Sequence, residues 1–283
     1  MGRKKIKRSP SGKVRPVKSL GQNFLTDESI IQQIVDGSEI SKETLVIEIG
    51  PGMGAITERL AQKAGRLVAI ELDRRLIPVL SVKLASYNNI EIVQGDILQV
   101  DLNEIINANL EPYGLKELRF VGNIPYYITS PIIMRLLEMK LQATSITLMM
   151  QKEVADRLLA EPGTRAAAPL TYAVHYYAHV SKVVDVGREC FYPSPKVDST
   201  VLRFDMREQA AVNLKDEKFY FECIKAGFMQ RRKTLLNALS AMEGYDRERV
   251  GAALDKAGIE HNRRAESLNM QEFAVLAEAL QEV

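Results

Sequence analysis

The sequence predicts an α/β fold in which a doubly wound sheet is followed by a small all-helical domain. Three observations support it. Strand-like and helix-like segments alternate up to about residue 160, β-rich segments follow, and only helical periodicity is seen from residue 216 onward. The length of 283 residues suits one sizeable α/β domain with a smaller appendage.

The alternation begins with a short apolar run, residues 45–49, that ends at glycines and is typical of a buried strand. Strands are predicted at 45–49, 67–70, 90–93, 118–121 and 145–150, and helices at 56–64, 74–85, 132–139 and 152–160. This rhythm implies a sheet with helices on both faces.

The pattern changes after the fifth strand. Residues 175–186 and 199–204 are β-rich and are expected to form a hairpin on the edge of the sheet. Helices are predicted at 219–230, 234–241, 247–257 and 270–280. We therefore expect a first domain over residues 20–206, a boundary near Met206, and a helical domain over residues 207–283.

Charge and composition narrow the function classes. Residues 1–18 carry eight lysines and arginines and no acid, and residues 1–19 are expected to form a flexible basic arm. Such an arm suits nucleic-acid binding and a merely solubilising tail equally. Cys190 and Cys223 form no disulfide or zinc pattern, which suits a cytoplasmic protein. The sequence has no secretory signal and no apolar run that could span a membrane.

A glycine-rich loop, residues 48–54, follows the first strand and precedes the first helix. Gly50 and Gly52 suit a tight turn that a ligand approaches closely, and Glu71 ends the second strand, where a carboxylate can bind ribose hydroxyls. Together with Ala55, the two glycines also satisfy a dinucleotide-binding pattern. These features predict a nucleoside cofactor but leave both NAD and S-adenosylmethionine open.

Two further segments favour S-adenosylmethionine. Asp96 follows the third strand, where it could accept a hydrogen bond from the adenine of the cofactor, although a turn or helix-cap role is the more common one. The decisive segment is Asn-Ile-Pro-Tyr, residues 123–126, directly after the fourth strand. Ligands bind at the carboxyl ends of strands in such sheets.

This segment suits an adenine amine as methyl acceptor. That nitrogen needs positioning rather than a strong base, because its proton becomes acidic once the nitrogen is alkylated. The Asn123 carboxamide oxygen and a backbone carbonyl beside Pro125 can each accept one N–H. Tyr126 can stack on the extruded base.

With these residues in view, the sequence resembles the ribosomal RNA adenine N6,N6-dimethyltransferases along nearly the whole chain from Leu20. Besides the segments above, the resemblance rests on residues 20–25 (Leu-Gly-Gln-Asn-Phe-Leu), 71–73 (Glu-Leu-Asp), 151–154 (Gln-Lys-Glu-Val), 191–199 (Phe-Tyr-Pro-Ser-Pro-Lys-Val-Asp-Ser) and 230–235 (Gln-Arg-Arg-Lys-Thr-Leu). It implies a Rossmann-like methyltransferase sheet.

The resemblance implies that the enzyme methylates, twice each, two adjacent adenosines in the 3′-terminal hairpin loop of 16S rRNA of the small ribosomal subunit. It implies that six residues contact S-adenosylmethionine, namely Asn23, Leu25, Gly50, Glu71, Asp96 and Asn123. It also places Phe191 against the flipped base opposite Tyr126, although by sequence alone Phe191 reads as a core residue.

In the helical domain, Arg231, Arg232 and Lys233 fit phosphate contacts, and a solvated helix end explains them equally well. No metal site and no obligatory oligomer are expected, and a monomer suffices. One departure from the family pattern is the run from Ala166 to Ala168, in place of a Tyr-Gly pair that many members carry.

Three other functions share part of this pattern. The first is a large-subunit (23S) rRNA adenine N6-methyltransferase that confers macrolide resistance, which shares every motif of the site. The length of the helical tail and the Arg-Arg-Lys-Thr-Leu segment favour the small subunit. The second is a non-catalytic RNA-binding or transcription factor, which the intact Asn123 and Tyr126 disfavour. The third is a nicotinamide dehydrogenase, for which no histidine, lysine or tyrosine is suitably spaced.

Overall fold

The computed structural model describes residues 15–17, 20–230 and 232–283. Its strands are β1 (Phe24–Leu25), β2 (Thr44–Ile49), β3 (Arg66–Glu71), β4 (Ile90–Gln94), β5 (Glu117–Asn123), β6 (Ser145–Gln151), β7 (Ala178–Val186), β8 (Phe191–Tyr192) and β9 (Ser199–Met206). Its α-helices are α1 (Glu28–Gly37), α2 (Thr57–Lys63), α3 (Ile77–Lys83), α4 (Leu102–Asn109), α5 (Thr129–Glu138), α6 (Lys152–Leu159), α7 (Pro169–Tyr177), α8 (Glu217–Met229), α9 (Leu235–Leu239), α10 (Arg247–Lys256) and α11 (Met270–Gln281).

A seven-stranded sheet in the order β4-β3-β2-β5-β6-β9-β7 forms the centre of the first domain. The strands from β4 to β6 pair in parallel, and β9 and β7 add antiparallel to the β6 edge. From β2 the chain builds outward through β3 to β4 and then returns to place β5 on the other side of β2. The order therefore reverses between β2 and β5, the position where sheets of this kind bind ligands.

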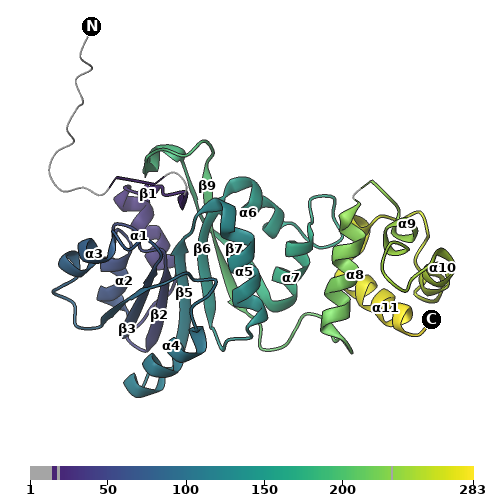
Figure 1. Cartoon of the computed structure of the whole chain (residues 1–283), viewed down its shortest axis with the longest axis horizontal. Coiled ribbons are helices and arrows are strands. Elements are labelled where there is room, and N and C mark those ends of the chain that lie inside the picture. Colours follow the sequence, from purple (N-terminus) through teal and green to yellow (C-terminus); the bar gives the residue numbers. More distant parts are fainter. Residues whose placement is uncertain (1–14, 18–19, 231) are drawn as a thin grey trace, which may run out of the picture.

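Helices cover both faces of this sheet, as Figure 1 shows. Side chains of α1 and α2 join one core cluster, and those of α4, α5 and α6 join another on the opposite face. All six residues of β2 are buried, which explains its continuous apolar run. The predicted fold class, a doubly wound α/β sheet followed by helices, is confirmed.

The predicted edge hairpin is present as β7 and β9. The first β-rich segment, however, begins later in the chain than the sequence predicts. His175 belongs to α7, and β7 begins only at Ala178. The helix starts at Pro169, and the Ala168 N–H donates to the Thr171 hydroxyl at 3.0 Å. Five of its nine residues are buried, so the one-sided pattern that would have identified the helix is missing.

Besides α7, two further helices of the first domain, α1 and α4, are absent from the sequence prediction. Each starts after an aspartate whose side chain accepts backbone N–H groups of the first turn. Asp27 accepts from Ser29 and Ile30 at 2.9 and 3.1 Å, and Asp101 accepts from Glu104 at 3.0 Å. An N-terminal aspartate of this kind is a sequence signal for a helix start.

Helices α8 to α11 form the core of the second domain. Side chains of the first domain also pack into this core. Strand β9 ends at Met206, where the sequence places the boundary. Yet Ala167, Tyr172 and Tyr176 pack into the core of the helical domain, while Val174 packs into the core of the sheet. Helix α7 is therefore shared by both cores.

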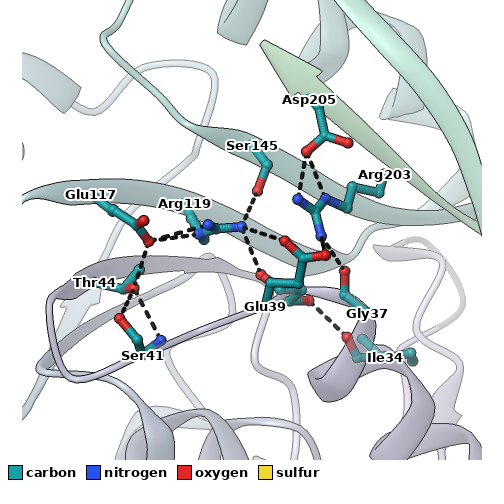
Figure 2. Close-up of polar contacts among 11 residues, drawn as sticks. Ile34, Gly37, Glu39, Ser41, Thr44, Glu117, Arg119, Ser145, Arg203 and Asp205 are labelled. Atoms are coloured by element: carbon teal, nitrogen blue, oxygen red, sulfur yellow. Dashed lines mark hydrogen bonds and ion pairs between the residues drawn. The ribbon is translucent and has the colours of Figure 1, made fainter.

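At the opposite end of the sheet from the carboxyl ends of its parallel strands, two arginines join several elements (Figure 2). Arg119 of β5 is 6% exposed and pairs with Glu117 at 3.1 Å. Arg203 of β9 pairs with Asp205 and with Glu39, both at 2.6 Å. Because Glu39 follows α1, this network ties that helix to the two strands and fixes the sheet beneath the ligand-binding edge.

Candidate active site

A cavity opens at the carboxyl ends of the parallel strands, where the strand order reverses. Each of four neighbouring strands supplies a residue that the sequence predicts for the site: Asp96 after β4, Glu71 of β3, Gly50 after β2 and Asn123 of β5. Residues far apart in the chain therefore line one cavity, because parallel strands bring their carboxyl ends to the same edge.

The glycine-rich loop lies directly beside the buried Glu71 carboxylate. Gly50 and Gly52 have φ values of +68° and +58°, a conformation that side chains disfavour. The Gly52 N–H donates to Glu71 Oε2 at 3.0 Å, and the Asp73 N–H donates to Oε1 at 2.8 Å. Burial raises the pKa of Glu71 above its ordinary value, and the two N–H donors oppose that rise.

Asp96 lines the cavity and also has the cap role considered for it. Its Oδ1 accepts the Leu98 N–H at 2.9 Å, in a turn that starts after β4. The cap and a ligand contact are compatible, since a carboxylate has several acceptor positions. The cap fixes the direction in which the carboxylate points.

The carboxamide of Asn123 is held by the segment that precedes α1. Its Nδ2 donates to the Asn23 carbonyl at 3.2 Å, and Asn23 in turn donates to the Gly21 carbonyl at 3.2 Å. With Nδ2 engaged, the Asn123 Oδ1 is the part of the carboxamide that remains to accept a donor. The structure thus orients the amide for acceptance rather than donation.

The two backbone carbonyls that follow Asn123, those of Ile124 and Pro125, differ in their hydrogen bonding. The Pro125 carbonyl accepts the Ile128 N–H at 3.2 Å and the Thr129 hydroxyl at 3.5 Å, so it serves the turn that leads into α5. The Ile124 carbonyl is therefore the better candidate for the predicted backbone acceptor that acts beside the Asn123 carboxamide. Pro125 itself has φ −59° and ψ 134°.

Tyr126 lines the cavity and is anchored at its hydroxyl. The hydroxyl oxygen lies 2.7 Å from the hydroxyl of Ser199, which is fully buried at the start of β9. Burial raises the pKa of Tyr126, so the phenol is neutral at physiological pH. The ring is thereby tied to the antiparallel strand across the sheet.

Leu25 and Phe191, both predicted site residues, face each other in the short β1–β8 pair. Leu25 lines the cavity, whereas Phe191 is 5% exposed within a core cluster and is not part of the cavity lining. The structure therefore brings together every predicted cofactor and base contact except Phe191, including Asn23, Gly52 and Pro125.

The predicted RNA contacts lie in the helical domain. Arg232 and Lys233 are exposed in the turn between α8 and α9. Arg231 and most of the basic arm, residues 1–14 and 18–19, lie outside the described residues.

Three residues beside the site have no assigned role in the sequence analysis. Glu48 lines the cavity, and Ser199 is hydrogen-bonded to Tyr126. Gln22 accepts the Val17 N–H at its Oε1 and donates from its Nε2 to Asp73 Oδ2, both at 2.9 Å. Gln22 and Ser199 fall inside the motifs quoted for the family resemblance, and that was the only sequence signal for them.

No group of three or more metal-ligating side chains gathers anywhere in the described part of the chain. Within the same residues, no helix is long and apolar enough to cross a membrane.

The comparison with protein families gives a match along almost the whole chain. The family model described as ribosomal RNA adenine dimethylase matches residues 15–282. Two relatives named ribosomal RNA small subunit methyltransferase A are each 46% identical to this chain. The one from Bacillus cereus (strain B4264) aligns over 93% of this chain and 90% of its own, and the one from Oceanobacillus iheyensis over 92% and 88%.

Solved structures share the fold. A dimethyladenosine transferase from Plasmodium falciparum has a TM-score of 0.77 at 24% identity, covering 92% of this chain and 98% of its own. The 23S rRNA methyltransferase ErmE has a TM-score of 0.69 at 30% identity, covering 92% and 100%. Both cover the sheet and the helical domain together.

Proposed function

This chain belongs to the ribosomal RNA adenine dimethylase family, and from that membership we propose how its cavity carries out the reaction. The chain is an S-adenosylmethionine-dependent methyltransferase that dimethylates adenosine in small-subunit rRNA. The proposal concerns the residues that do this and the nucleotides they act on.

The cavity fits the adenosyl part of S-adenosylmethionine by the chemistry of its donors and acceptors. Asp96 is an acceptor for the adenine amine, and Glu71 is an acceptor for the ribose hydroxyls. Gly50 and Gly52 let a ligand approach the backbone, and Asn23 and Leu25 close the cavity from the amino-terminal side. The cofactor supplies an activated methyl group on sulfur.

On the base side, Asn123 Oδ1 and the Ile124 carbonyl accept the two N–H groups of the target amine in the first transfer, and one of them accepts the single remaining N–H in the second. This directs the nitrogen lone pair toward the methyl group and stabilises the positive charge that develops on nitrogen. Tyr126 provides the stacking face. The observation that carries this proposal is that Asn23 occupies Nδ2 of Asn123, which leaves the oxygen for the substrate.

Phe191 remains our proposal for the second stacking face. Since it is 5% exposed and packs into a core cluster, a base can reach its ring only if β8 shifts when RNA binds. For this residue the geometry supports a structural role at least as well.

On the substrate side, we propose two adjacent adenosines of the 3′-terminal hairpin loop of 16S rRNA. Arg231, Arg232 and Lys233 would contact phosphates, which fix the position of the RNA without reading its sequence. The enzyme is proposed to act as a monomer, because this one chain supplies acceptors for both the cofactor and the target base. We propose a cytoplasmic location, since its substrate is ribosomal RNA.

The fold similarity to ErmE keeps the large subunit as a second candidate substrate. The deciding experiment incubates the protein with methyl-labelled S-adenosylmethionine and with either under-methylated small subunits or large subunits, and then maps the labelled nucleotides. We expect N6,N6-dimethyladenosine at two neighbouring positions near the 3′ end of the small-subunit rRNA. Label confined to large-subunit RNA, or spread over unrelated adenosines, would refute the proposed target.

The bond between Tyr126 and Ser199 allows a test of the stacking role. Tyr126→Phe and Ser199→Ala each remove it, and a hydrogen bond of about 1 kcal/mol corresponds to a roughly fivefold loss of methyl transfer. The double variant should lose no more than either single one, because both break the same bond. Tyr113→Phe, at an exposed ring that does not line the cavity, serves as the matched control. Losses that multiply in the double variant would show that the two hydroxyls act independently.

A further inference from the structure

Four polar side chains lie in sequence along the carboxyl edge of the sheet. In the order β4-β3-β2-β5, they are Asp96, Glu71, Glu48 and Asn123. Neighbouring strands are about 4.8 Å apart. If adenine and ribose lie over β4 and β3, as proposed above, the methionine part of the cofactor extends over β2 toward Asn123. The carboxylate at that place is Glu48.

Glu48 is buried in an unusual way. It lines the cavity, its side chain is 2% exposed, and no described residue donates a hydrogen bond of good geometry to its Oε2. The hydroxyl of Thr57 on α2 is the nearby donor. It also lacks a partner of good geometry, and its interaction with Glu48 lowers the pKa of that carboxyl by less than burial raises it. Leaving such a carboxylate charged and unpaired is costly, so its surroundings call for either a proton or a cation.

The charged groups around Glu48 do not supply that cation. Glu71 on β3 repels a second negative charge. Lys83 on α3 is the opposing positive group, but it pairs with Glu58 at 2.8 Å and donates to the Gly54 carbonyl at 2.8 Å. Burial, more than any neighbour, raises the pKa of Glu48 to about 8. At pH 7 the free protein therefore holds this group mostly in its neutral form.

We propose that Glu48 is the binding residue for the cationic methionine end of the cofactor, neutral in the free protein and ionised in the complex, so that binding releases a proton. The cation is the ammonium or the sulfonium, both of which lie beyond the ribose. The proton passes to the solvent and no covalent bond changes. The proposal depends on the adenosine placement over Asp96 and Glu71.

Calorimetric titration of the wild-type protein tests this directly. At pH 6.5, in two buffers of different ionisation enthalpy, the number of protons released is measured for three probes. These are S-adenosylmethionine, S-adenosylhomocysteine, which keeps only the ammonium, and methylthioadenosine, which has neither cation. We expect about one proton per site with S-adenosylmethionine and none with methylthioadenosine.

S-adenosylhomocysteine identifies the cation: about one proton assigns Glu48 to the ammonium, and none assigns it to the sulfonium. Either result supports the proposal. No release with any probe, or equal release with methylthioadenosine, overturns it. The adenosine placement is judged separately, since it fails if methylthioadenosine does not bind at all.

The variant Glu48→Gln keeps the shape of the side chain and removes its titration. In the wild type, affinity for S-adenosylmethionine should rise with pH by up to tenfold per unit between about 6 and 8 and then level off. Glu48→Gln should lose both this rise and the proton release, and bind methylthioadenosine within about twofold of the wild type. Loss of the release in Glu71→Gln but not in Glu48→Gln would overturn the assignment. If Glu48→Gln does not fold, the wild-type proton counts and the Glu71→Gln variant still decide.

Discussion

Replacing Asn123 with alanine is expected to reduce methyl transfer by at least about 100-fold, the usual cost of losing one positioned group that stabilises transition-state charge. The variant lacks the oxygen that accepts an N–H of the target amine and directs its lone pair. Measured on under-methylated small subunits, the loss should appear in kcat, while affinity for the RNA stays within a few fold of the wild type.

Asn103→Ala is the matched control, because Asn103 lies exposed on α4 and should leave turnover unchanged. Binding of S-adenosylhomocysteine to Asn123→Ala should weaken only modestly, since Asn123 contributes one of several contacts. Wild-type turnover in Asn123→Ala would reject the mechanism. A loss entirely explained by weaker RNA binding would reassign Asn123 to substrate affinity.

The largest expected effect on stability comes from Tyr172→Ala. Tyr172 lies on α7 with its ring edge-on to Phe228 and Phe273, at centroid distances of 5.6 and 5.3 Å. Its hydroxyl donates to the Leu268 carbonyl at 2.6 Å. Removing a buried aromatic ring costs about 3–5 kcal/mol. Hydrogen exchange should show the loss in α8 and α11 of the helical domain.

Tyr172→Phe keeps the ring and should cost only about 1–2 kcal/mol for the lost hydrogen bonds. Tyr113→Ala removes an exposed tyrosine whose ring stacks under Arg66 at 4.6 Å, and it should cost less than about 1 kcal/mol. If Tyr172→Ala were no more harmful than Tyr113→Ala, α7 would not hold the two domains together.

The parallel core of the fold was predictable because its strands are short apolar runs, most of them followed by a segment with helical periodicity. Residues 45–49 and 145–150 match β2 and β6 to within one residue at each end. Helix α7 was not predictable from periodicity, because it is buried by the sheet on one side and by the helical domain on the other. Its apolar residues lie on all sides of the helix. They are there because the helix contacts segments about 50 to 100 residues later in the chain.

The site was predictable where a strand end fixes a residue, as for Glu71, Asp96 and Asn123. It was not predictable where the partner comes from elsewhere in the chain. The contact between Tyr126 and Ser199 spans 73 residues, and the burial of Phe191 depends on pairing with Leu25. In the sequence, Glu48 is simply the first residue of a glycine-rich loop. Only the structure shows that its carboxylate is buried with an oxygen that has no hydrogen-bond partner.

The β1–β8 pair links the lining of the cofactor cavity to the segment that contains Phe191. Leu25 faces the cofactor cavity, and the backbone next to it is bonded to Cys190 through the Thr26 N–H at 2.8 Å and the Thr26 hydroxyl at 3.0 Å. A displacement of either strand therefore carries the other with it. Two ligands that each hold one strand in place would favour each other's binding by an equal factor, whichever arrives first.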